Sequence, residues 1–171
     1  MKRSRRDFLT MGWKAGGALL GIAAGWTVFQ SLRPLAGAGG GGPIALGAPA
    51  NYPLDSATYV PAGRLYVTNT KDQAGTENFF ALSQKCPHLG CKVPFCETSG
   101  RFECACHGSV FDLGGEWITG PSPTGMNRYK TDVVAGTVVV DTGALETGPP
   151  HGEKKYFTPR KGPSCTDGKG S

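Results

Sequence analysis

Two stretches of the chain alternate apolar and polar residues with a period of two, which predicts half-buried β-strands. One covers residues 64–68 and the other runs from Tyr129 to Val134. The second is followed by the apolar residues 137–140 across Ala135-Gly136, and this spacing predicts a β-hairpin. Between residues 44 and 146 no long run repeats apolar residues at the helical spacing. This region therefore predicts one small all-β domain of about a hundred residues.

The N-terminus has a different pattern. Residues 15–32 are eighteen consecutive uncharged and largely apolar residues. A helix of that length is roughly 27 Å long at about 1.5 Å per residue, which is enough to cross a bilayer core. Five Lys or Arg residues precede the run and only Arg33 follows closely, so the positive-inside rule places the N-terminus in the cytoplasm. We expect residues 1–14 to form a cytoplasmic segment and residues 15–35 to form a transmembrane anchor.

The residues Ser4-Arg5-Arg6-Asp7-Phe8-Leu9 resemble a twin-arginine signal, which exports bacterial proteins that fold before they cross the membrane. Ala36-Gly37-Ala38 resembles a cleavage site, so the segment could be removed as a signal peptide. In contrast, Gly17, Gly21 and Gly25 form two overlapping G-x-x-x-G units, a pattern that packs transmembrane helices. Such signals are often rich in glycine, but we favour retention of the segment as an anchor.

Residues 36–43 include four consecutive glycines, which no regular element accommodates cheaply. The general interpretation is a passive linker. The alternative is a flexible tether for a mobile domain, and residues 37–43 would have an r.m.s. span of about 14 Å.

Charge is divided unevenly along the chain, whose formal net charge is +5. Residues 44–146 contain seven Lys or Arg and ten Asp or Glu, a net charge of −3, so the basic excess lies at the two ends. No basic stripe with interleaved aromatic residues is present, so the sequence gives no reason to expect nucleic-acid binding. It also contains no phosphate-cradling glycine loop and no paired-carboxylate site.

The chemistry of the chain is concentrated in two short runs. Each run supplies a Cys-then-His pair and one extra cysteine, and together they contain Cys86, His88, Cys91, Cys104, Cys106 and His107. Two thiolates with two imidazoles suit a structural zinc ion or a [2Fe–2S] centre with two histidines on one iron. A third interpretation is six structural cysteines in three disulfides. The chain has no C-x-x-C-H motif for c-type haem.

The pattern C-x-H-x15-C-x2-H, with a spare cysteine in each run, resembles the Rieske iron–sulfur proteins. It is most similar to the branch found in quinol-oxidising cytochrome bc-type complexes. The resemblance implies an antiparallel β domain at residues 44–146, with an inserted cluster-binding subdomain at about 84–124. It also implies one [2Fe–2S] cluster per chain, bound by Cys86, His88, Cys104 and His107, beside a disulfide between Cys91 and Cys106.

Flanking residues strengthen this resemblance. Gly90 and Gly108 follow the ligand positions, where we expect backbone N–H groups to approach the sulfur atoms without an obstructing side chain. Ser109 matches the family serine whose hydroxyl donates to a bridging sulfide. Gly120-Pro121-Ser122-Pro123 resembles the proline loop that covers the cluster, although alone it reads as a surface turn.

One residue departs from the high-potential relatives. Phe111 occupies the position where they carry a tyrosine whose hydroxyl bonds a cysteine ligand. Hydrogen bonds to sulfur stabilise the reduced cluster and raise its potential. We therefore expect a potential near the middle of the approximate Rieske range of −150 to +300 mV, which suits menaquinol.

Cys96 and Cys165 remain after these assignments, the latter in the Gly/Lys/Pro-rich tail at residues 147–171. A second disulfide between them would fasten the tail to the cluster subdomain, and oxidative export would permit it. The alternative is a free, buried Cys96 and a disordered tail.

The resemblance implies the electron-transfer subunit of a membrane quinol:cytochrome oxidoreductase with several subunits. Its domain would lie on the outer face of a bacterial cell membrane. His107 would contact quinol at a cytochrome b-type subunit, and a c-type cytochrome would accept the electron. The main rival is the Rieske small subunit of an exported molybdenum oxidase similar to arsenite oxidase. A Rieske ferredoxin or oxygenase domain and a non-redox zinc module are the others.

Overall fold

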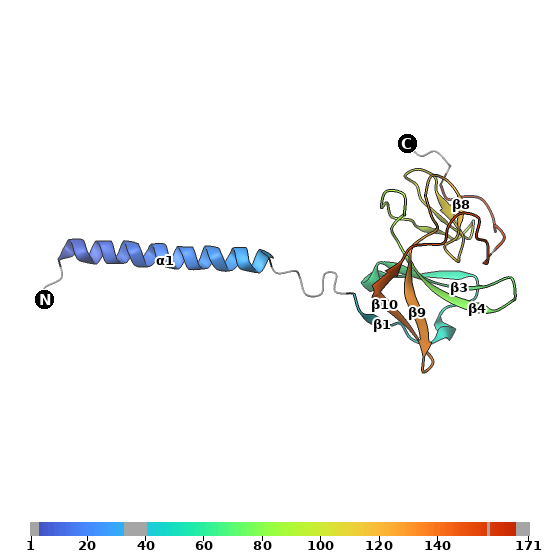
Figure 1. Ribbon diagram of the computed structural model, residues 1–171, viewed down its shortest axis with the longest axis horizontal. Helices are drawn as coiled ribbons and strands as arrows, with labels where there is room; N and C mark the ends of the chain where they lie inside the picture. Colours follow the sequence, from blue (N-terminus) through green and yellow to red (C-terminus); the bar gives the residue numbers. More distant parts are fainter. Residues whose placement is uncertain (1–3, 33–40, 157, 167–171) are drawn as a thin grey trace. The chain divides into compact units, whose positions relative to one another are not determined.

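The structure is a computed structural model that describes residues 4–32, 41–156 and 158–166. It divides into two compact units, Met1–Gly40 and Gly41–Ser171. In Figure 1 the first is a single helix and the second consists of two antiparallel sheets with their connecting loops. The predicted cleavage site at residues 36–38 and most of the predicted tether lie outside the described residues.

Helix α1 spans Arg5–Leu32, so it is longer at its N-terminal end than the predicted anchor. It begins at a capping box, in which the Asp7 amide donates to Ser4 Oγ (3.2 Å) and the Ser4 amide donates to the Asp7 carboxylate (3.1 Å). Within the described residues, no helix combines the length and the apolar character that a membrane span requires. The helix itself is confirmed, and the transmembrane part of the prediction is not.

The larger sheet has six antiparallel strands in the order β1-β10-β9-β4-β3-β2. The bounds of its strands are β1 Pro43–Ala45, β2 Ser56–Val60, β3 Leu65–Lys71, β4 Glu77–Ser83, β9 Arg128–Val134 and β10 Thr137–Glu146. Short 3₁₀ turns at Pro49–Asn51 and Pro61–Gly63 precede β2 and β3. The predicted strands at 64–68 and 129–134 and the hairpin after Val134 are confirmed.

The smaller sheet has four antiparallel strands in the order β5-β6-β7-β8, all within residues 95–119. Its strands are β5 Phe95–Cys96, β6 Arg101–Glu103, β7 Val110–Phe111 and β8 Trp117–Thr119. Two- and three-residue strands bury little by themselves, so this sheet depends on what packs against it.

Strands β3 and β4 contribute apolar side chains to two hydrophobic cores, one on each face of the larger sheet. Successive side chains on a strand point to opposite faces. Leu65, Val67 and Ala81 enter one hydrophobic core with the β10 valines. Tyr66 and Leu82 point the other way, into a second core. That second core also contains Cys86, Val93, Phe102, Cys104, Phe111, Leu113 and Met126. The loops that contain Cys86 and Cys104 therefore pack, through this second core, on the face of the larger sheet that carries Tyr66 and Leu82.

The C-terminal end of the predicted tether belongs to the sheet unit, which corrects that prediction. Pro43 pairs with Asp141 in the sheet. The Gly42 amide donates to Thr142 Oγ1 (3.1 Å), and the Thr142 hydroxyl donates to the Gly42 carbonyl (3.0 Å). A Cβ on Gly41 would lie 2.3 Å from the Gly143 Cα, so only glycine fits there. Residues 41–43 are fixed by strand pairing that the sequence pattern did not reveal.

The hairpin turn gives a test of local geometry. Ala135 has φ 47° and Gly136 has φ 74°, and two-residue hairpin turns with two positive φ angles prefer Asn-Gly. We expect Ala135→Asn to raise the free energy of unfolding by roughly 0.5–1 kcal/mol, because alanine is strained in this region. Gly136→Ala is the matched control: no other residue lies within 4 Å of its Cβ position, so its expected loss is purely conformational. Urea unfolding of both variants measures the two effects, and equal stability of all three proteins would contradict this account.

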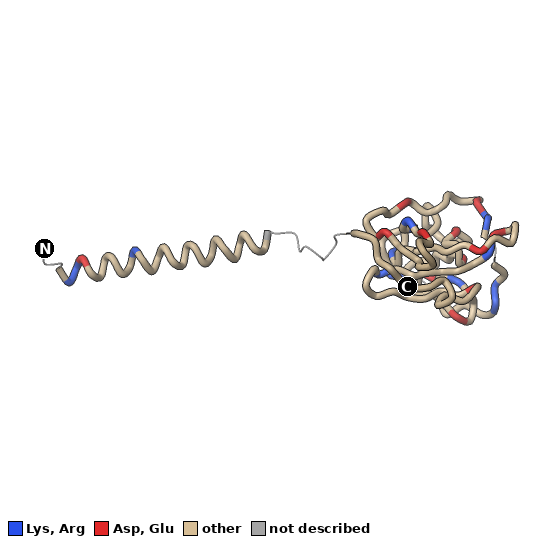
Figure 2. Tube along the Cα trace, turned by 90° about the horizontal axis from the view of Figure 1, so that it is seen from below, with Lys and Arg blue, Asp and Glu red and all other residues tan. Residues whose placement is uncertain are grey.

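Charged residues are distributed differently in the two units. In α1 the charges are confined to Arg5, Arg6, Asp7 and Lys14, at its N-terminal end (Figure 2). In the sheet unit, basic and acidic residues are scattered over the trace in the same view.

Candidate metal centre

The two ligand runs form loops with the same hydrogen-bond pattern. In the first, the Cys86 amide donates to the Cys91 carbonyl (2.7 Å) and the Gly90 amide donates to the Cys86 carbonyl (2.9 Å). In the second, the Cys104 amide donates to the Ser109 carbonyl (2.8 Å) and the Gly108 amide donates to the Cys104 carbonyl (3.0 Å). Each loop is thus a closed turn that begins at the cysteine predicted to bind iron.

Gly90 and Gly108 occupy equivalent places in these turns, with φ 78° and 75°. Positive φ favours glycine because a Cβ would strain the backbone. We expected glycine here to keep side chains away from the sulfur atoms, but no other residue lies within 4 Å of either Cβ position. Among the contacts within the protein, it is therefore the positive φ of the turn that favours glycine at these two positions.

Cys86 and Cys104 are the free cysteines of the described chain, and both are buried. Burial raises the pKa of the Cys86 thiol, and the adjacent Cys104 thiol raises it further, against hydrogen bonds from the His88 amide and the Ser109 hydroxyl. A metal centre makes its cysteine ligands thiolates, which offsets the cost of burying them. The pair therefore suits a soft, positively charged metal centre.

His88 and His107 lie next to each other, one from each loop. Their ring centroids are 4.8 Å apart and the rings are nearly perpendicular. His107 is exposed and His88 is half-buried. The loops thus bring the two imidazoles together, and each loop also supplies one of the two buried thiols.

Both predicted disulfides are present. Cys91 pairs with Cys106 between the two loops, and Cys96 pairs with Cys165 of the tail. The Cys104 sulfur lies within 4.8 Å of the sulfurs of Cys91 and Cys106, so the first disulfide adjoins the site. With Cys86 and Cys104 free, the interpretation as three disulfides is wrong.

The residues 120–123, predicted as the proline loop, lie against the second ligand loop. The Ser122 amide donates to Ser109 Oγ over 3.1 Å, and both serines are buried. A Cβ on Gly120 would lie 2.4 Å from the Ser109 Cα. Pro121 and Pro123 are exposed, so the loop presents its prolines outward and its backbone to the site.

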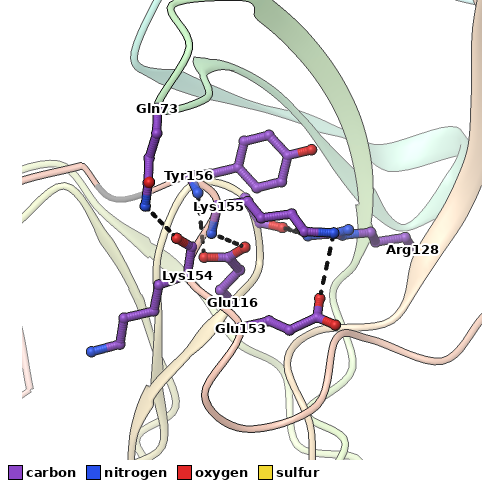
Figure 3. Close-up of polar contacts among 8 residues, drawn as sticks. Gln73, Glu116, Arg128, Glu153, Lys154, Lys155 and Tyr156 are labelled. Carbon is purple, nitrogen blue, oxygen red and sulfur yellow. Dashed lines mark hydrogen bonds and ion pairs between the residues drawn. The ribbon is translucent and has the colours of Figure 1, made fainter.

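The tail packs on the smaller sheet. From the sequence we expected only one of these contacts, the disulfide of Cys165. Glu116 is 2% exposed, and its carboxylate accepts the amides of Lys155 (2.8 Å) and Tyr156 (3.4 Å), as Figure 3 shows. In the same view the Gln73 side chain donates to the Lys154 carbonyl. Further along, the Arg101 guanidinium donates to the hydroxyl and the carbonyl of Thr158. The available sequence signal was the charged residues among apolar strand residues, Arg101 and Glu103 around Phe102 and Glu116 just before Trp117, because charged residues that become buried need partners.

Glu103 closes this network beside the second disulfide. Its carboxylate accepts hydrogen bonds from the Ser99 hydroxyl, the Cys165 amide, and the amide and hydroxyl of Thr166. Burial alone would raise its pKa, but these four donors outweigh burial and hold the pKa of Glu103 below its usual value. The last described residues are therefore fixed to the sheet by a charge as well as by a disulfide.

Asp112 is the buried acid with the opposite behaviour. Burial raises its pKa to about 7, against the Glu116 amide that donates to it, while the Glu116 charge adds to the rise and Arg101 opposes it. Folding therefore favours the protonated acid, and the stability present below the unfolded pKa of about 3.8 is lost as pH rises through about 7.

We expect Asp112→Asn to remove this loss, because asparagine stays neutral and still accepts the Glu116 amide. At about 1.36 kcal/mol per pKa unit, the variant should be more stable at pH 8 by a few kcal/mol, with the difference shrinking toward pH 5. Urea unfolding at both pH values tests it. The same pH dependence in both proteins would show that Asp112 is charged throughout.

Comparisons with known proteins agree with this geometry. Residues 52–130 match the model of the Rieske [2Fe-2S] domain. The cytochrome b6-f complex iron-sulfur subunit of Prochlorococcus marinus strain MIT 9312 is 33% identical over 150 residues, which cover 81% of this chain and 83% of the relative. The subunit of that name from Synechococcus elongatus is 29% identical over 170 residues, 92% of each chain. Among solved structures, the plasma membrane Rieske protein PetC3 from Synechocystis PCC 6803 matches 57% of this chain and 98% of its own, with 26% identity and a TM-score of 0.43.

The chain belongs to the Rieske iron–sulfur family, and its cofactor is a [2Fe–2S] cluster. The zinc interpretation is therefore wrong. The donor set fits the cluster, since two free buried thiols and two adjoining imidazoles lie on paired loops beside a disulfide.

Proposed function

We propose that this protein is the electron-transfer subunit of a membrane quinol:cytochrome oxidoreductase. The supporting observation is the extent of the similarity to cytochrome b6-f complex iron-sulfur subunits. It covers 81% to 92% of this chain, whereas the Rieske domain match ends at residue 130 and begins at residue 52. A free-standing ferredoxin domain would share only the cluster domain. A cytochrome b-type subunit and a c-type cytochrome are the partners that this function requires.

We assign Cys86 and Cys104 to one iron and His88 and His107 to the other. When bound, the cluster accepts one electron at a time. Of the two histidines at the site His107 is the exposed one, and Leu89 in the other ligand loop is 71% exposed, so the His107 ring is accessible to a quinol hydroxyl. In this proposal its free ring nitrogen accepts the quinol proton as the electron enters the cluster, which keeps charge balanced.

The location follows from the proposed complex. The Ser4-Arg5-Arg6-Asp7 sequence would direct export of the folded domain, and helix α1 would then hold the chain to the membrane complex with its N-terminus in the cytoplasm. A flexible tether before Gly41 would let the domain move between quinol and cytochrome.

The rival is a Rieske small subunit of a molybdenum oxidase, which relays electrons without quinol. A specific observation keeps it in view: Phe111 is fully buried and brings no hydroxyl to the site, a feature shared with that class. The two functions differ in the cofactor that the partner subunits carry, which is b-type haem in one case and molybdenum in the other. We expect an affinity-tagged chain solubilised from its native membrane to carry b-type haem, seen as a reduced-minus-oxidised absorbance band. Co-purifying molybdenum without b-type haem would overturn the proposal.

Phe111 also bears on the quinone, which we propose to be menaquinol. Its ring lies in the same core as Cys86 and Cys104, so a hydroxyl introduced there could reach a cysteine sulfur. We expect Phe111→Tyr to raise the midpoint potential by roughly 60 mV, corresponding to about 1.4 kcal/mol for a one-electron couple. Titration of the reduced-cluster EPR signal measures the change, with Phe79→Tyr, whose ring packs against the other core, as control. A fall or no change would remove the argument for menaquinol.

A further inference from the structure

The third histidine of the chain, His151, is bound to the loop that covers the site. Its ring stacks on the indole of Trp117, with centroids 3.9 Å apart and 19° between the planes. His151 Nε2 lies 2.7 Å from the Ser122 carbonyl oxygen. A carbonyl only accepts, so Nε2 carries a proton and donates. The Trp117 indole N–H donates in turn to the Gly120 carbonyl over 3.0 Å. One stacked pair therefore holds two carbonyls of the same loop.

The backbone on both sides of His151 is held by hydrogen bonds that do not involve the imidazole ring. The Gly125 amide donates to the Pro149 carbonyl (2.8 Å), and the Gly148 amide donates to Asn127 Oδ1 (3.1 Å). On the other side, Lys155 is bound to Glu116. The imidazole is thus presented to the loop by a rigid backbone, and a substitution at residue 151 leaves that backbone anchored.

The loop passes this constraint to the site through Ser122. Ser122 is fully buried. Its amide donates to Ser109 Oγ, and its carbonyl accepts from His151 Nε2. Ser109 in turn lies at the site: its carbonyl accepts the Cys104 amide over 2.8 Å, and its hydroxyl acts on the Cys86 sulfur by lowering the pKa of that thiol. A hydroxyl that accepts one hydrogen bond is a stronger and better-directed donor in the next. Three groups thus form a line from the tail to a cysteine of the site.

We propose that His151 is a positioning residue for the cluster. It holds Ser122 so that Ser109 keeps its hydrogen bond to the Cys86 sulfur, and the C-terminal tail thereby raises the reduction potential. Hydrogen bonds to sulfur favour the reduced, more negative cluster, so loss of this support disfavours reduction. The inference rests on the proposed assignment of Cys86 as an iron ligand. It adds to the proposed function a determinant outside the Rieske domain match, which ends at residue 130.

The test uses the full chain and two substitutions that separate stacking from hydrogen bonding. His151→Phe keeps a ring on Trp117 but cannot donate, whereas His151→Gln can still donate to the Ser122 carbonyl. Lys154→Ala is the matched control, since this side chain is exposed and only its carbonyl has a partner. The readouts are the midpoint potential of the EPR signal and the hydrogen-exchange rate of the Ser122 amide.

We expect His151→Phe to lower the one-electron reduction equilibrium constant about three- to tenfold, where tenfold corresponds to 59 mV. Its Ser122 amide should exchange faster than in the parent chain. His151→Gln should recover most of both losses and Lys154→Ala should change neither. An unchanged potential and exchange rate in His151→Phe would overturn the inference.

A double-variant comparison tests the route through Ser109. In a Ser109→Ala chain the last hydrogen bond is already absent, so adding His151→Phe should lower the potential no further. A second, equal loss would overturn the route. The ligand assignment fails differently: if Cys86 did not bind iron, Cys86→Ala would keep the parent EPR signal, whatever His151 does.

Discussion

Replacing Cys104 with alanine is expected to give a folded chain that holds no [2Fe–2S] cluster. Cys104 is one of two free, buried cysteines, and an iron that loses one of its two thiolates is left with an open, labile position. Its removal takes one small group from a core that also contains Phe102 and Phe111, so the sheets should persist. Iron and acid-labile sulfide content, with the EPR spectrum of the reduced protein, measure the loss.

The matched control is replacement of a cysteine pair outside the site. Cys96 and Cys165 form the second disulfide, so a chain lacking both should keep its cluster. Far-UV circular dichroism separates loss of the cluster from loss of the fold. Stoichiometric iron in the Cys104→Ala chain would refute the ligand assignment.

The second large effect is on stability. The disulfide between Cys96 and Cys165 closes a loop with a sequence separation of 69, and the chain-entropy relation gives roughly 4 kcal/mol for such a loop. We expect the double variant Cys96→Ser/Cys165→Ser to lose a stability of that order in urea unfolding. The loss should exceed that of a cap or a surface pair because it releases the end of the tail.

A comparison within the same network distinguishes the disulfide from its neighbours. Glu103→Gln retains the disulfide but weakens the bonds to Cys165 and Thr166, so it should cost less than the double variant. Alkylation of the unfolded chain without reduction provides a direct check. Cys86 and Cys104 account for two added masses in the parent chain, and further alkylation at Cys96 and Cys165 would show that the disulfide is absent. A double variant as stable as the parent would show that the disulfide contributes nothing to stability.

The parts of this structure that could be predicted are those determined by local sequence. The ligand loops repeat one turn, with a cysteine at the start and a glycine four residues later, so their chemistry is visible in a few residues. The hairpin at Ala135-Gly136 follows from two alternating strands and a turn pair. The central strand β4 was not predicted, because its residues 77–83 do not alternate and their burial comes from the sheet around them.

The features that escaped prediction involve contacts between distant residues. Glu103 bonds to Thr166, which is 63 residues away, and His151 bonds to Ser122, 29 residues away. Neither pair has a local signature, and a Gly/Lys/Pro-rich tail gives no periodic pattern from which to infer packing. The end of the tether was misplaced for the same reason, since pairing of Pro43 with Asp141 is decided by the fold.

The measurement that tests the central claim most directly is a potentiometric titration of the cluster's EPR signal in native membranes, with and without a quinol-site inhibitor. If His107 meets quinol at a cytochrome b-type subunit, the account predicts a Rieske signal of intermediate potential that shifts when the inhibitor is present. A Rieske signal with the same potential and shape in both samples would contradict it.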